Sequence, residues 1–255
     1  MPFKKIEAEK LASAVVRQVE NLILRGILRP GDRLPAEREL AERLGVSRPS
    51  LREAIAELSE RGLLEARAGA GIYVADILGG VFSPALVRLF QNHDDALLDH
   101  IAFRRDMEGL AASRAARQGS ETDLRVVSEI FAKMETAHAR RDAAEEARLD
   151  ADFHMAIVEA SHNVVMLHLM RAMMDLLREG VVYNRAVMFR QRTTRDTLLD
   201  QHREIERALR LRDPEGAQAA VEGHLDFVRR CLIDQREADR HEETAQLRLQ
   251  QEGAR

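Results

Sequence analysis

The chain has 255 residues, of which 45% are hydrophobic, and contains no Trp, two Tyr and one Cys. This length allows two domains that each bury a core. The single cysteine, Cys231, excludes an internal disulfide and favours a reducing compartment. No apolar run approaches the roughly 20 residues of a membrane span, and the start MPFKKIEAEK does not resemble a secretory signal. We therefore expect a cytoplasmic protein without a membrane partner.

Charge is unevenly distributed along the chain. Residues 1–75 carry 13 Lys and Arg against 11 Asp and Glu, a net charge of +2, whereas the whole chain carries −4. Residues 76–255 consequently carry −6. Only the N-terminal segment is expected to approach a polyanion, and its small excess favours a few placed contacts and two cooperating copies over a broad basic surface.

Residues 35–75 have the pattern of two short helices followed by a hairpin. Apolar residues recur at helical spacing on both sides of Gly45, which permits a sharp turn. Ser47 is a natural N-cap for the second helix, Pro49 suits its first turn, and Gly62 ends it after about 14 residues. Residues 63–67 and 72–75 flank a glycine-containing tip at residues 68–71. This order predicts a winged helix-turn-helix, which is a DNA-binding fold.

The candidate DNA contacts lie on the second helix and at the hairpin tip. Arg48 and Arg52 are one turn apart at the helix end that enters the major groove in such folds. Arg38 begins the preceding helix and is placed to reach the flanking backbone, and small residues at the tip allow close approach to DNA. The alternative is that these arginines form a solvated surface. The residues predicted to contact DNA are Arg38, Arg48, Ser50, Arg52, Gly69 and Gly71.

The remainder of the chain is predicted to be helical. Residues 77–84 include two glycines and a proline without periodicity, which is typical of a linker between a domain at residues 1–76 and a second at residues 85–235. Caps and stop signals delimit the helices. We expect helices at residues 84–91, 94–118, 121–140, 142–161, 163–190, 195–211 and 214–238. Residues 236–255 are almost all polar and are predicted to form a frayed helix or a disordered tail. The expected fold class is mainly α, with an N-terminal winged helix-turn-helix and a C-terminal all-α bundle.

Four residues of the second domain could bind a metal ion. Asp150 and His154 are four residues apart and share one helix face. His202 and His224 lie on two further helices among apolar residues that face the core. One carboxylate and three imidazoles from three helices suit a divalent ion, with zinc expected and manganese or nickel as alternatives. The competing interpretation is that they only pack in the core. Surface or packing roles are expected for the remaining histidines, His93, His100, His138, His162, His168 and His241.

The N-terminal pattern resembles the GntR family of bacterial transcription regulators. The matching residues are Gly-Asp-Arg-Leu-Pro at 31–35, Arg38, Gly-Val-Ser-Arg at 45–48, Leu-Arg-Glu-Ala at 51–54 and Gly-Leu at 62–63. The resemblance implies that Arg38, Arg48, Arg52 and the glycines of the wing contact an operator. The wing departs from the family at Ile72, where a threonine usually follows Gly71.

Residues 84–235 resemble the FCD effector domain of the FadR subgroup of that family. The resemblance implies that Asp150, His154, His202 and His224 hold a metal. It also implies that Arg104 and Glu108 lie on the opening helix, with Arg104 facing a cavity where it can meet the carboxylate of an effector. Ala102 replaces a glutamate usual in the family. Residues 159–169, Glu-Ala-Ser-His-Asn-Val-Val-Met-Leu-His-Leu, are especially similar to the lactate- and pyruvate-responsive branch, LldR and PdhR.

These patterns together predict a regulator that binds an inverted-repeat DNA operator as a homodimer. A small carboxylic acid such as lactate or pyruvate is expected to bind beside the metal, pair with Arg104 and change the affinity for DNA. Two alternatives remain. The metal could be a structural staple or itself the signal, without an organic effector. The second domain could instead be a metal-dependent hydrolase fused to a DNA anchor, although the sequence contains no HExxH motif and no evident general base; no catalytic residue is predicted.

Overall fold

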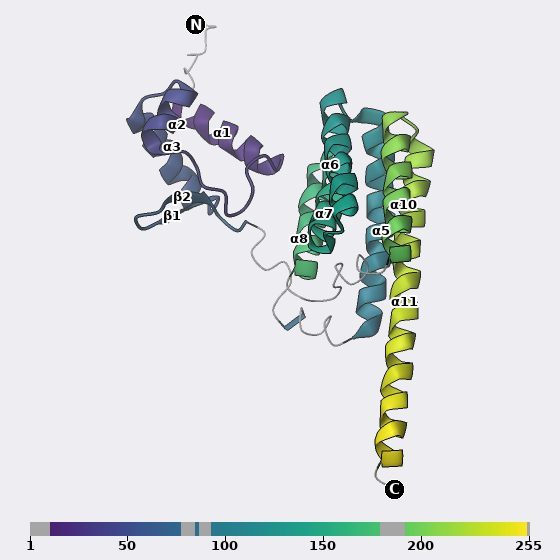
Figure 1. Cartoon of the computed structure of the whole chain (residues 1–255). Coiled ribbons are helices and arrows are strands. Elements are labelled where there is room, and N and C mark those ends of the chain that lie inside the picture. The colour runs from purple at the N-terminus through teal and green to yellow at the C-terminus, as the bar shows by residue number, and fades with distance from the viewer. Residues whose placement is uncertain (1–10, 78–84, 87–92, 179–191, 254–255) are drawn as a thin grey trace, which may run out of the picture. The chain divides into compact units, whose positions relative to one another are not determined.

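The computed structural model describes residues 11–77, 85–86, 93–178 and 192–253. The chain divides into two compact units, Met1–Val81 and Phe82–Arg255, which are considered separately (Figure 1). The prediction of a mainly α fold, with an N-terminal winged helix-turn-helix and a C-terminal helical bundle, is confirmed. Within the described ranges, no helix is both long enough and apolar enough to cross a membrane.

Residues 11–77 of the first unit form three helices and one hairpin. Helices α1 (Leu11–Leu24), α2 (Glu37–Leu44) and α3 (Arg48–Glu60) precede strands β1 (Leu64–Arg67) and β2 (Gly71–Val74). The strands are antiparallel, in a register that pairs Leu64 with Val74 and Arg67 with Gly71. Arg33 adds an isolated bridge to Tyr73. The expected order of helix, turn, helix and hairpin is therefore present.

Local sequence explains the turn between α2 and α3. Gly45 adopts a left-handed conformation with φ of 65° and terminates α2, a geometry that glycine adopts without steric cost. Ser47 caps α3 as predicted, because its hydroxyl accepts a hydrogen bond from the backbone N–H of Ser50 at 3.2 Å. Gly62, with φ of 71°, follows the end of α3. Helix α3 is 13 residues long, close to the 14 expected.

Helix α1 was not among the predicted elements. One face of α1 is buried, contacts α3 and forms part of the core of the first unit. The spacing of its buried residues is that of an amphipathic helix. These residues are Ala12, Val15, Val16, Val19 and Ile23.

The second unit is a bundle of long helices. They are α5 (Asp94–Gln118), α6 (Glu121–Arg140), α7 (Ala143–Ala160), α8 (Val164–Arg178), α10 (Arg192–Arg210) and α11 (Pro214–Gly253). Helix α5 contacts both α7 and α11, while α6 and α10 pack on α7 and α11 respectively (Figure 1). Fully buried residues from several helices, including Phe153, Ile205 and Leu225, form the central core. This core surrounds the polar site described below.

Most predicted helix boundaries agree with the structure within a few residues. Those of α5 and α6 coincide with the predictions, and α10 begins at Arg192 rather than at residue 195. Residues 85–86 of the helix predicted at 84–91 are helical. The rest of that predicted helix, most of the linker at 77–84 and residues 179–190 of another predicted helix lie outside the described residues.

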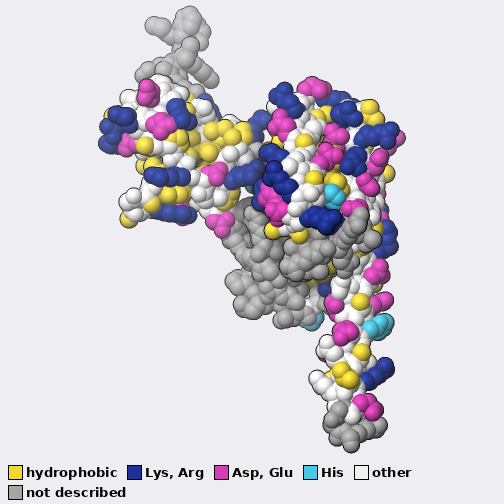
Figure 2. Space-filling view, in the orientation of Figure 1, with side chains coloured by type: hydrophobic (Ala, Val, Ile, Leu, Met, Phe, Trp, Pro, Cys, Tyr) yellow, Lys and Arg dark blue, Asp and Glu magenta, His cyan; other side chains and the backbone are white. Residues whose placement is uncertain are grey.

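Of the two alternatives predicted for the tail, the structure has the helix, because α11 continues to Gly253 instead of ending at residue 238. Its final part is exposed, and both acidic and basic side chains lie along it in Figure 2. Residues 236–253 are rich in Glu, Gln, Arg, Ala and Leu, which favour helix. Side-chain hydrogen bonds four residues apart add support: Gln235 donates to Asp239 at 2.8 Å, and Gln246 donates to Glu242 at 3.0 Å.

Candidate functional site

The exposed N-terminal end of α3 carries Arg48 and Arg52. Their side chains are 54% and 63% exposed, and both bind the carboxylate of Glu37 at the start of α2. The Nε atom of Arg48 donates to Glu37 Oε1 at 2.9 Å, and that of Arg52 donates to Oε2 at 3.0 Å. Hydrogen bonds from Arg52, and to a smaller extent from Arg48, lower the pKa of Glu37. One carboxylate thus holds both arginines side by side.

The other predicted DNA contacts occupy different positions. Arg38 is exposed in the first turn of α2. Ser50 is half-buried, and its hydroxyl lies 2.9 Å from that of Ser47, so it takes part in the cap of α3. Gly69 and Gly71 are exposed on the wing with φ angles of 69° and 113°. Both angles favour glycine, which keeps the tip of the wing narrow.

Two residues near this surface were not predicted. Glu37 precedes Arg48 by 11 residues, so no helical spacing reveals the contact. Arg67 is half-exposed on β1, and its guanidinium lies 4.3 Å from the centroid of the Tyr73 ring. The alternation of side chains in the hairpin could have indicated that residues 67 and 73 share a face.

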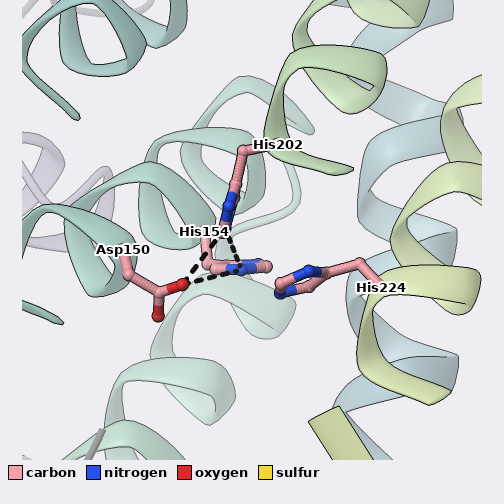
Figure 3. A group of neighbouring side chains, drawn as sticks. All are labelled: Asp150, His154, His202 and His224. Carbon is pink, nitrogen blue, oxygen red and sulfur yellow. Dashed lines mark hydrogen bonds and ion pairs between the residues drawn. The ribbon is translucent and has the colours of Figure 1, made fainter. Parts of the chain in front are cut away.

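In the second unit, Asp150, His154, His202 and His224 come together as the sequence predicted (Figure 3). The first two extend from α7, the third from α10 and the fourth from α11. All four are buried, and one ligand atom from each lies within 4.8 Å of the others. The Oδ1 atom of Asp150 is 3.1 Å from His202 Nε2 and 3.8 Å from His154 Nε2. We call these four residues the quartet.

Apolar neighbours place each member of the quartet at the core. Phe153 and Ile157 bury the face of α7 beside His154. The predicted apolar partners of His202 and His224 are likewise buried: Leu198, Ile205 and Leu209 on α10, and Val221, Leu225 and Val228 on α11. Helical periodicity therefore determines which faces carry the quartet, and the packing of α7, α10 and α11 brings those faces together.

The three imidazoles direct their Nε2 atoms inward because each Nδ1 atom faces an acceptor. His202 Nδ1 donates to the backbone oxygen of Leu198 at 2.6 Å, and His224 Nδ1 lies 3.0 Å from the amide oxygen of Gln201. His154 Nδ1 lies 2.6 Å from Glu108 Oε2, although the arrangement is not that of a linear hydrogen bond. A proton on Nδ1 leaves the lone pair of Nε2 available to a metal.

Burial keeps the imidazoles suited to metal binding. It lowers the pKa of His154 and, together with the neighbouring His202 and His154, holds the pKa of His224 well below its ordinary value. Neutral imidazole is the form that binds metal. The Nε2 atoms of His154 and His202 lie only 3.4 Å apart, so two lone pairs facing each other there repel unless a cation lies between them. The donor set therefore fits a divalent ion.

Arg104 lies beside the quartet but is already engaged. Its Nε atom donates to Glu108 Oε1 at 2.6 Å, and both side chains are 2% exposed. Burial alone would raise the pKa of Glu108, but Arg104 and His154 hold it well below its usual range. The charge of Arg104 also lowers the pKa of His154 and of His224, which places this guanidinium in the electrostatic environment of the quartet.

The sequence did not predict the supporting contacts. Glu108 follows Arg104 by one helical turn, but nothing in the sequence connects it with His154 on another helix. Gln201 immediately precedes His202, yet it contacts His224 of α11. Such contacts depend on how the helices pack, so spacing along one helix cannot reveal them.

Other histidines lie in separate polar contacts. His138 is 3.3 Å from Glu146 and 3.2 Å from Asp196, and His162 is 2.9 Å from Asp123. Within the described part of the second unit, the quartet is the group of histidine and acidic side chains whose geometry could hold a metal ion.

Comparison with known proteins accounts for both units. Residues 11–74 match the family described as bacterial regulatory proteins, gntR family, and residues 99–227 match the FCD domain. The chain is 32% identical to the Glc operon transcriptional activator of Escherichia coli over 90% of this chain and 92% of that protein. It is 35% identical to the putative L-lactate dehydrogenase operon regulatory protein of the same organism, covering 86% and 85% of the two chains.

A solved structure described as Streptococcus agalactiae GntR is 26% identical, with a TM-score of 0.52, and the match covers 86% of this chain and 99% of that one. These relatives are transcription regulators rather than enzymes. The described residues accordingly combine a DNA-binding unit with a helical unit of the FCD type. This chain belongs to the GntR family of bacterial transcription regulators, within its FadR subgroup whose members carry an FCD domain.

Proposed function

We propose that this regulator binds an inverted-repeat operator as a homodimer in the cytoplasm, and that a small carboxylic acid bound at a divalent metal controls its affinity for DNA. A two-fold dimer suits an inverted repeat, since each recognition helix reads only a few base pairs. The acidic second unit leaves the first unit, with its small positive excess, to approach the phosphates.

Arg48 and Arg52 are proposed to contact bases from the N-terminal end of α3. They are exposed, adjacent and oriented by one carboxylate, which limits the entropy lost when they bind. Arg38 and Ser50 flank them on α2 and α3, and the glycines at positions 69 and 71 let the wing approach the backbone closely.

The observation that carries the metal proposal is the arrangement of the quartet. Three buried imidazoles and a buried carboxylate converge on one point, where an uncompensated cluster of polar atoms would be costly. Ligand atoms around an ion at about 2.1 Å lie roughly 3.0 to 3.4 Å apart when adjacent, which agrees with the shorter separations in the quartet. Modest adjustment of the longer ones would complete the site.

Coordination number bears on the identity of the ion. Four protein ligands fill a tetrahedral zinc site, whereas a six-coordinate ion with the same ligands keeps two positions open. A 2-hydroxy or 2-keto acid offers two oxygen atoms, one from its carboxylate and one from the neighbouring group. Zinc with expanded coordination, manganese or nickel would serve, and effector binding favours the ions that accept six ligands.

Charge favours a monoanionic effector. Asp150 and Glu108 contribute two negative charges, while Arg104 and a divalent ion contribute three positive ones. With neutral imidazoles the site retains one positive charge, which a single carboxylate would neutralise. We propose that the ion supplies the excess charge, and that Arg104 also pairs with the acid while its Nε atom stays bonded to Glu108. The name of one relative refers to an L-lactate dehydrogenase operon, which supports a lactate- or pyruvate-like acid.

Elemental analysis tests the metal proposal. The wild-type chain should carry about one divalent ion, and His202→Ala combined with His224→Ala should abolish binding, because two of four ligands are lost. His162→Ala is the control, since this exposed histidine contacts Asp123 outside the quartet. Full metal content in the double variant would identify the histidines as packing residues.

A further inference from the structure

Glu108 connects two groups that belong to different helices. It extends from α5 and is 1% exposed. One carboxylate oxygen accepts the hydrogen bond from Arg104 Nε, and the other lies 2.6 Å from His154 Nδ1 on α7. Arg104 Nη2 adds a longer contact to this second oxygen at 3.4 Å. A single buried carboxylate is therefore held by a guanidinium on one side and faces a quartet imidazole on the other.

The three imidazoles have chemically different supports. The Nδ1 atom of His202 faces a backbone carbonyl and that of His224 a neutral amide oxygen, whereas the Nδ1 atom of His154 faces a carboxylate. A carboxylate is the stronger acceptor, and its negative charge raises the basicity of the ring that donates to it. The support of His154 is therefore expected to matter most for binding a cation.

We propose that Glu108 is a positioning residue for the metal centre: it holds the His154 ring with Nε2 directed inward and strengthens that atom as a ligand. Arg104 is the group that makes this possible, because a buried carboxylate without a cationic partner would be costly. This inference rests on the proposed metal site. It extends that site to α5, so that α5, α7, α10 and α11 all contribute to it.

Two substitutions separate charge from hydrogen bonding. Glu108→Ala removes both, and the affinity for Co(II), measured by competition with a chelator, should fall about 10- to 100-fold. Glu108→Gln retains an oxygen that can accept a hydrogen bond from His154 Nδ1, so its affinity for Co(II) should fall less than that of Glu108→Ala. Cobalt also provides a signature beyond affinity: proton NMR of the cobalt-loaded wild type should show three shifted, exchangeable imidazole N–H signals. Glu108→Ala should broaden one of them through exchange with water, and Glu108→Gln should restore it.

Glu146→Gln is the matched control. Glu146 is an equally buried carboxylate on α7 and binds Arg195 with a shortest distance of 2.6 Å. This variant should lower the melting temperature while leaving cobalt affinity and the three signals unchanged. Wild-type affinity with three sharp signals in Glu108→Ala would overturn the role of Glu108 alone, whereas failure of the wild-type chain to bind cobalt would overturn the metal site as well.

Discussion

Glu37 and Glu108 are single carboxylates that each connect side chains of a candidate functional site. Glu37 accepts hydrogen bonds from Arg48 and Arg52 on the exposed surface. Glu108 makes the corresponding bridge in the buried core, between Arg104 and His154. The exposed bridge can exchange with water and DNA at little cost, since surface ion pairs contribute little stability. The buried bridge is shielded from water, which suits the proposed metal centre.

Arg48→Ala or Arg52→Ala should each weaken specific DNA binding by about 1 to 3 kcal/mol, because each removes a guanidinium that can contact a base edge. Fluorescence anisotropy with an operator selected from random DNA measures this loss. Arg61→Ala is the control, because Arg61 lies at the opposite end of α3 and binds Glu20 and Glu57. Unchanged affinity in both test variants would remove these arginines from the interface.

The metal-free chain should lose stability as the pH falls below about 6.5, the ordinary pKa of histidine. The pKa values of His154 and His224 are lowered in the folded chain, so the unfolded chain binds more protons and acid favours unfolding. Their stabilising contribution is present above that pH and is lost as the pH falls. Thermal unfolding of chelator-treated protein between pH 8 and pH 5 measures the effect.

His224→Asn should weaken this pH dependence, because it removes a histidine whose pKa burial and the neighbouring imidazoles hold well below its ordinary value. His138→Asn, outside the quartet, serves as the comparison. Parallel curves of melting temperature against pH for the wild type and His224→Asn would show that His224 does not contribute.

At the scale of secondary structure, local signals account for the elements that the sequence predicts well. Ser47 and Gly45 define the turn before α3, and Ser120 caps α6 through a reciprocal capping box with Asp123. These signals act within a few residues, so they can be recognised in a single sequence. Helical periodicity also identified the quartet, because each of its members lies on the apolar face of its own helix.

The errors at this scale have equally physical causes. The end of α11 is polar and exposed, so its composition left a frayed helix and a disordered tail as alternatives. Strong helix formers and pairs such as Gln246 with Glu242 support the helix there. Helix α1 has a regular apolar face that was overlooked. Contacts such as that of Glu108 with His154 join residues that are 46 positions apart in the sequence and lie on different helices. Only the packing of the bundle reveals them.

At the scale of the whole molecule, the proposed function assigns recognition of DNA to the first unit and sensing of an acid to the second. Binding of an acid can alter regulation only if the operator-competent arrangement and another arrangement bind that acid with different affinities. Coupling of this kind usually amounts to about 1 to 3 kcal/mol. A homodimer would apply it to both half-sites of an inverted repeat, and a monomer in sedimentation at micromolar concentration, bound one per site, would contradict that assembly.

The most direct test of the proposed function is the operator affinity of metal-loaded protein with and without saturating lactate or pyruvate. We expect one of these acids to change the affinity about 5- to 150-fold. The change should disappear in the His202→Ala and His224→Ala double variant and be reduced in Arg104→Ala. Identical affinity with and without each acid, in protein shown to contain the metal, would contradict the proposal and leave the ion as a structural element or as the signal itself.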